Sequence, residues 1–230
     1  MSTVSKRLVE LTKPGWLIEE ADGALNCIAC GHRCLIPPGK SGICRMRINV
    51  NNQLLVPWGY VAAANVDPIE KKPFMHFLPG CNALTFGMLG CNFHCDFCQN
   101  WVSSQTLRDP ASDSSLRYIQ EISPEALVRI AINSGAKVIA SSYNEPLITT
   151  EWAIEIFKTA KAHGLKCVYV SNGFATPEEL EALKPYLDGY KIDLKCITDH
   201  KYRSLGGSLQ IVQDTIQRAH DLGMWVEVVT

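Results

Sequence analysis

The chain has 230 residues, of which 47% are apolar, and a formal net charge of −1 at pH 7. This near-neutral charge argues against binding to nucleic acid or to an anionic membrane, and no stretch approaches the roughly 18 consecutive apolar residues of a membrane span. Seven of the ten cysteines fall into two tight clusters, which favours metal binding over disulfides. We therefore expect a cytoplasmic protein, in a reducing setting, that binds neither nucleic acid nor membrane.

The first 80 residues are predicted to form a separate N-terminal part. Residues 1–26 carry only weak helical signals and are predicted to be an arm. Four cysteines follow on a turn-rich segment, namely Cys27, Cys30, Cys34 and Cys44. Such a set is typical of a small metal knuckle, in which the metal replaces a hydrophobic core. A structural zinc, a second iron–sulfur cluster that relays electrons, and a segment without metal all fit this spacing.

Two further elements are predicted in this N-terminal part. Alternating apolar residues between 47 and 59 flank Asn51 and Asn52, a pattern that predicts a β-hairpin closed by the two asparagines. The charged segment DPIEKKP at 67–73 ends in a proline and is predicted to be an ordered surface loop.

From residue 81 onward, strands and helices alternate. Strands are predicted at 83–87, 138–140, 167–170, 190–194 and 224–229, and helices at 124–134, 150–163, 177–184 and 209–222. Ser123 and Thr176 each precede a proline and are predicted to cap the helix that follows. Successive βα units imply a parallel sheet with right-handed crossovers, either closed as a barrel or open. Because the chain ends on an apolar strand with no helix to cover it, we expect a fragment, or a barrel completed from outside the sequence.

The segment CNFHCDFCQN at 91–100 places Cys91, Cys95 and Cys98 within eight residues, with the spacing C-x3-C-x2-C. Thiolates favour iron–sulfur clusters, zinc or copper(I), so this loop predicts a metal site. A ferredoxin-type run requires a fourth cysteine close by, and no cysteine follows this loop until Cys167. A cubane cluster held by three thiolates keeps one iron free for a small molecule.

Polar residues follow the next three predicted strands. The second strand leads into SSYNE at 141–145, the third into SNG at 171–173, and the fourth into Asp193 and Lys195. In βα barrels the carboxyl ends of the strands meet at one rim, where binding and catalytic residues gather. Each set alone is typical of a turn or of a structural ion pair. Together, behind a three-cysteine loop, they indicate one ligand site.

These motifs resemble the radical S-adenosylmethionine (SAM) enzymes related to pyruvate formate-lyase activase and other glycyl-radical-enzyme activating enzymes. A fuller set is similar to one branch, the AmmeMemoRadiSam system radical SAM enzyme. The motifs that carry this similarity are CGHRCLIPPGKSGICR at 30–45, DPIEKKP at 67–73, HFLPG at 76–80 and YNEP at 143–146. The resemblance spans residues 27–230, and members of the family continue past this point.

The resemblance implies an α/β fold, with an incomplete (β/α)6 barrel at 81–230 behind a cysteine-rich N-terminal subdomain at 1–80. It also implies a [4Fe–4S] cluster on Cys91, Cys95 and Cys98, whose free iron binds SAM. A flavodoxin or ferredoxin would supply the electron that cleaves SAM into methionine and a 5′-deoxyadenosyl radical. That radical would then abstract a hydrogen atom from the substrate, so that the cofactor performs the difficult chemistry.

The resemblance also implies a set of SAM-binding residues, namely Asn144, Glu145, Ser171, Asn172, Asp193 and Lys195. Glu145 stands where the superfamily has an acid that contacts the SAM amino group, although Tyr143 and Asn144 replace the usual glycines before it. Lys195 is expected to bind the SAM carboxylate. His94, inside the cysteine loop, is expected to be a hydrogen-bonding neighbour rather than a metal ligand.

The resulting expectation is an activase-like oxidoreductase that uses SAM and abstracts hydrogen from an unknown substrate. One alternative is an activase that makes a glycyl radical on a partner protein. An alternative from another class is an electron-transfer iron–sulfur module or a zinc-binding module. The family name adds two companion proteins of the AmmeMemoRadiSam system as expected partners.

Overall fold

The computed structural model describes the backbone of residues 3–230 and the side chains of residues 6–111 and 114–230. Its main element is a six-stranded sheet with the strand order β14-β13-β12-β11-β9-β8. These strands are β8 (Ala63–Pro68), β9 (Asn82–Gly87), β11 (Val138–Ser141), β12 (Lys166–Ser171), β13 (Gly189–Asp193) and β14 (Trp225–Val229). Neighbouring strands from β9 to β14 pair in parallel, whereas β8 pairs antiparallel with β9 at the edge. The predicted α/β partial barrel is confirmed.

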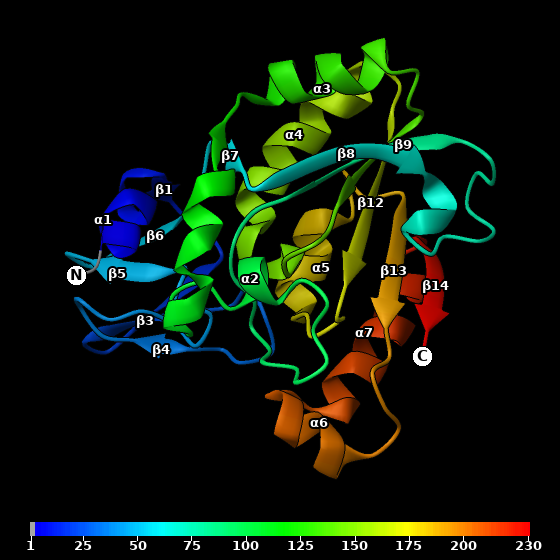
Figure 1. Cartoon of the computed structure of the whole chain (residues 1–230). Coiled ribbons are helices and arrows are strands. Elements are labelled where there is room, and N and C mark those ends of the chain that lie inside the picture. The colour runs from blue at the N-terminus through cyan, green and yellow to red at the C-terminus, as the bar shows by residue number, and fades with distance from the viewer. Residues whose placement is uncertain (1–2) are drawn as a thin grey trace.

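Helices connect the parallel strands, and Figure 1 shows the sheet curving beside them. They are α3 (Pro124–Asn133), the 3-10 helix η3 (Pro146–Thr149), α4 (Thr150–Ala162), α5 (Pro177–Leu183), α6 (Asp199–Leu205) and α7 (Leu209–Asp221). The larger hydrophobic core includes residues of this sheet and of these helices; Phe86 of β9 and Phe157 of α4, for example, have ring centroids 6.4 Å apart. Both predicted caps form, because the Ser123 and Thr176 side chains accept hydrogen bonds from the backbone N–H groups of Ala126 and Glu179.

A separate apolar cluster joins the sheet to the segment that precedes β9. Its buried members are Ile69, Phe74, Ala83, Val138, Ala140 and Val168. Ile69 and Phe74 are fully buried, so the segment between β8 and β9 packs against the sheet. The prediction of a surface loop at 67–73 is therefore wrong in part: Asp67 and Pro68 end β8, and residues Ile69–Lys71 form the 3-10 helix η1. The sequence pattern does not reveal this packing, because the apolar residues of the segment occur singly among charged ones.

The N-terminal part forms two small antiparallel sheets, β1-β6-β5 and β2-β3-β4. Its elements are α1 (Thr3–Glu10), β1 (Thr12–Pro14), β2 (Ile18–Ala21), β3 (Ala24–Cys27), β4 (Leu35–Ile36), β5 (Ile48–Val50), β6 (Gln53–Pro57) and β7 (Tyr60–Val61). The prediction of an arm at 1–26 is wrong for residues 3–26, since Leu17 and Leu25 are buried in a core that also contains Leu54 and Val56 of the hairpin; residues 1 and 2 lie outside the described residues. Local signals there are weak because strands of three or four residues gain their burial from partners distant in sequence.

The predicted hairpin is confirmed. Strands β5 and β6 pair antiparallel, and Asn51 and Asn52 both have positive φ, as a tight two-residue turn requires. The division of the chain at residue 80 stays a prediction; β8 precedes that point yet belongs to the main sheet.

The remaining elements lie between β9 and α3. They are α2 (Trp101–Ser104), the 3-10 helix η2 (Pro110–Tyr118) and β10 (Gln120–Glu121), which pairs with β7. Within the described part of the chain, none of the helices has the length and apolar character that crossing a membrane requires.

Candidate functional site

The three-cysteine loop leaves the end of β9 and leads into α2. Phe93 anchors it: this side chain is fully buried, and its ring lies 5.2 Å from that of Phe174 and 6.4 Å from that of Tyr202. The Phe93 carbonyl also accepts hydrogen bonds from Gln105 Nε2 at 3.2 Å and from Arg108 Nη1 at 2.6 Å. Contacts within the protein therefore hold the loop backbone in place without a ligand.

One cavity of about 470 Å³ contains this loop and the ends of the neighbouring strands. Its walls include the three loop cysteines, Cys91, Cys95 and Cys98. They also include all six residues that the sequence assigned to SAM, namely Asn144, Glu145, Ser171, Asn172, Asp193 and Lys195. The parallel register of β9, β11, β12 and β13 brings these loops together at one edge of the sheet.

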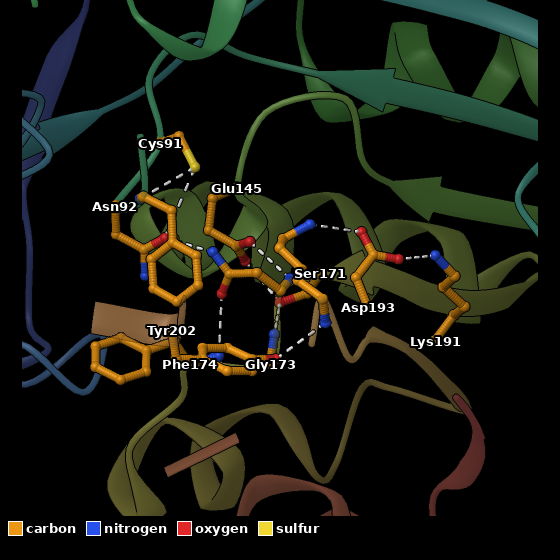
Figure 2. Close-up of polar contacts among 12 residues, drawn as sticks. Cys91, Asn92, Glu145, Ser171, Gly173, Phe174, Lys191, Asp193 and Tyr202 are labelled. Atoms are coloured by element: carbon orange, nitrogen blue, oxygen red, sulfur yellow. Dashed lines mark hydrogen bonds and ion pairs between the residues drawn. The ribbon is translucent and has the colours of Figure 1, made fainter. Parts of the chain in front are cut away.

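Glu145 lies at the centre of the polar contacts in this cavity (Figure 2). Its Oε1 accepts hydrogen bonds from Ser171 Oγ at 2.7 Å and from Leu147 N at 3.2 Å, and its Oε2 accepts one from Asn172 N at 2.9 Å. The side chain is buried, and burial raises the pKa of the Glu145 carboxyl to about 7 despite these donors. A cation beside Glu145 would favour its carboxylate form.

The SNG motif forms the turn after β12. Gly173 has a φ of 70°, which favours glycine, and its N–H donates to Ser171 Oγ at 3.0 Å. Asn172 Oδ1 accepts from Phe174 N at 3.0 Å, and Asn172 Nδ2 donates to Asn92 Oδ1 at 2.7 Å. This turn is thereby joined to the residue that directly follows Cys91.

Asn92 was missed by the sequence analysis. Its side chain is fully buried, and Oδ1 lies 3.8 Å from Cys91 Sγ as well as 2.7 Å from Asn172 Nδ2, as Figure 2 shows. The available signal was an amide directly after the first cysteine of the loop. Its position indicates that it aligns the cysteine loop with the SNG turn.

Asp193 is the last residue of β13, and its carboxylate lies between the ammonium groups of Lys191 and Lys195. It forms ion pairs with Lys191 Nζ and, at 3.1 Å, with Lys195 Nζ. Burial acts to raise the pKa of Asp193, but the two lysines hold it below its ordinary value. Burial acts to lower the pKa of Lys195, but the Asp193 carboxylate raises it above its ordinary value, so Lys195 stays cationic. The cavity thus presents a carboxyl at Glu145 and an ammonium at Lys195.

His94 lies apart from this arrangement. It is exposed and does not line the cavity of about 470 Å³; it lines a second cavity, of about 690 Å³, which Cys95, Arg45 and Arg108 also line. The expectation that His94 is not a metal ligand stays a prediction.

The four N-terminal cysteines lie in the small subdomain. Cys27, Cys30 and Cys44 are buried and Cys34 is partly buried, and all four are free. Burial raises the pKa of the Cys44 thiol to about 11 and also raises the pKa values of Cys30 and Cys34.

Among the residues that the structure describes, no three histidine, cysteine, aspartate or glutamate side chains are arranged to hold a metal ion. The assignment of ligands therefore depends on the donors themselves and on the site they share. Cys91, Cys95 and Cys98 fit an iron–sulfur cluster in this respect, since thiolates are its usual ligands and the three line the same cavity as Glu145 and Lys195.

Residues 86–230 match the Radical SAM superfamily. The chain belongs to this superfamily. Radical SAM proteins are enzymes, and the family implies a [4Fe–4S] cluster and SAM as cofactors.

The chain is also similar to one curated relative and to two solved structures. The uncharacterized protein MJ0808 of Methanocaldococcus jannaschii is 35% identical over 208 residues, which make up 90% of this chain and 60% of that protein. Among solved structures, native anSMEcpe with bound AdoMet has a TM-score of 0.45 and 12% identity, covering 61% of this chain and 40% of its own. QueE from Escherichia coli has a TM-score of 0.40 and 12% identity, covering 74% and 93%.

Proposed function

We propose that this radical SAM protein binds a [4Fe–4S] cluster through Cys91, Cys95 and Cys98 and cleaves SAM reductively to abstract hydrogen from a substrate. The observation that carries the proposal is the shared cavity, which these cysteines line together with Glu145 and Lys195. When bound, the cluster supplies the electron for SAM cleavage. This chain spans about 60% of the length of the curated relative it matches. We therefore propose the activity for the whole protein.

The charges of the cavity fit the charges of SAM. SAM carries an ammonium and a carboxylate on its methionine portion, and the cavity offers Glu145 for the first and Lys195 for the second. An ammonium beside Glu145 would stabilise its carboxylate and oppose the cost of burying it. Asp193 keeps Lys195 charged and in place, while Ser171 and Asn172 fix the orientation of Glu145.

We assign the chain to the AmmeMemoRadiSam branch because two motifs of that branch contact each other. Lys72, from DPIEKKP, lies 3.1 Å from the hydroxyl of Tyr143, from YNEP. The branch brings with it a cytoplasmic location, a flavodoxin or ferredoxin as electron donor, and the two companion proteins of the system as partners. The N-terminal cysteines would hold zinc or a second cluster, which metal analysis of Cys30→Ser protein would test.

Two alternatives make different predictions. An activase, suggested by Asp193-Leu194-Lys195, would generate a glycyl radical on a partner protein, which electron paramagnetic resonance would detect. An electron-transfer or zinc-binding module would show no affinity for SAM. The cavity disfavours a simple electron carrier, because a carrier needs no charged pocket of about 470 Å³ beside its cluster.

The decisive experiment uses the full-length protein, reconstituted anaerobically with iron and sulfide and treated with a strong reductant. We expect 5′-deoxyadenosine to form from SAM, and Cys95→Ala to abolish both this product and the cluster absorbance. Cys81→Ala is the matched control, since Cys81 is a partly buried cysteine that packs beside Ile69, away from the cavity. Unchanged product formation by Cys95→Ala protein would refute the proposal.

A further inference from the structure

The turn after β11 has a strained backbone. Tyr143 has a φ of 68°, and the N–H of Asn144 donates to the carbonyl of Ser142 at 2.9 Å. A hydrogen bond across one residue of positive φ defines a γ-turn of the rare, strained type. For a residue with a bulky side chain, such a backbone persists only where surrounding contacts hold it.

This γ-turn determines how Glu145 lies relative to the cysteine loop. Asn144 Oδ1 accepts a hydrogen bond from Met88 N at 2.8 Å, and Glu145 N donates to Gly90 O at 3.3 Å. Met88 and Gly90 begin the loop that carries the three cysteines. A change in the turn would therefore move Glu145 and the start of this loop together.

The contacts that hold Tyr143 come from residues outside the matched superfamily region. The Tyr143 hydroxyl accepts hydrogen bonds from Lys72 Nζ at 3.1 Å and from Asn65 Nδ2 at 3.2 Å. Lys72 Nζ also lies 4.7 Å from the centroid of the Tyr143 ring, a cation–π distance. Asp67 Oδ2, 3.3 Å from Lys72 Nζ, holds the ammonium in this position.

Two features show that this contact is built into the fold. Lys72 is 7% exposed, which is unusual for a lysine in a charged segment. Gly87 leaves room for the turn, because a β-carbon there would lie 2.5 Å from Ser142 O and 2.8 Å from Tyr143 Cβ.

We propose that Lys72 is a positioning residue for the SAM site. It does not line the cavity. It acts through the Tyr143 ring, which it fixes so that the strained turn presents Glu145 and the start of the cysteine loop in one arrangement. The inference rests on the proposed function, in which Glu145 binds the SAM amino group. It also assigns a role to Lys72 of the DPIEKKP motif, whose other charged residues, Asp67, Glu70 and Lys71, are partly or fully exposed.

The test is a double-mutant cycle on the reconstituted full-length protein, with SAM affinity measured anaerobically by equilibrium dialysis. Lys72→Met should weaken SAM binding about fivefold, the scale expected for losing one hydrogen bond and a cation–π contact. In a Tyr143→Gly background, Lys72→Met should have no further effect, because glycine adopts positive φ without support. An equal loss in both backgrounds, or no loss in either, would overturn the proposal.

Two variants separate this role from general stability. Lys71→Met removes the neighbouring lysine, which pairs with the same Asp67 at 2.9 Å but is 67% exposed, and should leave SAM affinity unchanged. Lys72→Gln keeps a donor for the Tyr143 hydroxyl and should recover part of the lost affinity. Affinity that falls as much with Lys71→Met as with Lys72→Met would contradict the inference.

A second measurement does not depend on SAM. Hydrogen exchange at the Met88 and Asn144 amides should accelerate at least about fivefold in Lys72→Met protein. The acceptors of these amides, Asn144 Oδ1 and Ser142 O, both belong to the turn. If wild-type protein fails to bind SAM, the proposed function fails, and this exchange comparison still decides the role of Lys72. Unchanged exchange at both amides would refute that role.

Discussion

The ion pair between Arg47 and Glu151 joins the N-terminal part to α4, and its loss should be among the most damaging single changes in this fold. Arg47 Nη1 and Nη2 lie 2.7 and 2.6 Å from the two oxygens of Glu151. The side chains are 1% and 0% exposed. Glu151 also accepts from Leu17 N at 3.3 Å, and Arg47 donates to Ile148 O at 3.2 Å.

Glu151→Gln keeps the size of the side chain and removes its charge. The Arg47 guanidinium would then be buried without a counter-charge, which costs about 3–5 kcal/mol when one partner of a buried pair is removed. Since domains are stable by only about 5–15 kcal/mol, we expect a large fall in the free energy of unfolding. The midpoint of urea unfolding, followed by circular dichroism, measures it.

Glu178→Gln is the matched control. Glu178 also pairs with an arginine of the N-terminal part, Arg33, at 2.6 Å, but these side chains are 38% and 39% exposed. Exposed pairs contribute at most about 1 kcal/mol, so this variant should unfold nearly as the wild type does. Replacing both members of the buried pair, with Arg47→Met and Glu151→Leu, should restore most of the loss. If Glu151→Gln costs no more than Glu178→Gln, the reasoning from burial is wrong.

Three further predictions concern the cavity and its supports. Burial raises the pKa of Glu145 to about 7 from 4.5, and binding an ammonium requires the carboxylate. Below pH 7, SAM affinity should therefore increase about tenfold for each unit by which the pH is raised, and above pH 7 it should level off. Calorimetric titration checks this, and a flat profile from about pH 6 to 8 would contradict it. Gly173→Ala should lower the free energy of unfolding by about 2 kcal/mol or more, since φ is positive and the β-carbon would lie 2.6 Å from Ile192 Cγ2; a urea midpoint like that of wild type would argue against this. Thr176→Ala should cost about 1 kcal/mol through loss of the α5 cap, and Thr176→Ser should restore it; no recovery would indicate that the methyl group, rather than the cap, matters.

Much of the candidate site could be predicted from sequence because its parts follow local rules. The C-x3-C-x2-C spacing marks the metal loop, and apolar runs alternating with capped helices locate the parallel strands. In a parallel sheet, the residues after each strand must then share one edge, so the sequence alone predicts that Glu145, Asn172 and Asp193 lie together. The caps at Ser123 and Thr176 depend only on residues within one helical turn.

The rest depended on which side chains face each other across long separations. In the segment at 3–26, Leu17 and Leu25 are buried in one cluster with the hairpin residues Leu54 and Val56, and no local pattern encodes that packing. The strand β8 is placed by its antiparallel register with β9.

The same limit applies to the polar contacts of the interior. The sequence by itself determined that three thiols and a ring of polar strand ends would share a site. Only the tertiary structure decided that Arg47 neutralises Glu151 and that Lys72 supports Tyr143. The physical reason is that burial and charge pairing depend on which residues are neighbours in space. Such neighbours can be far apart in the sequence, as Lys72 and Tyr143 are, 71 positions apart.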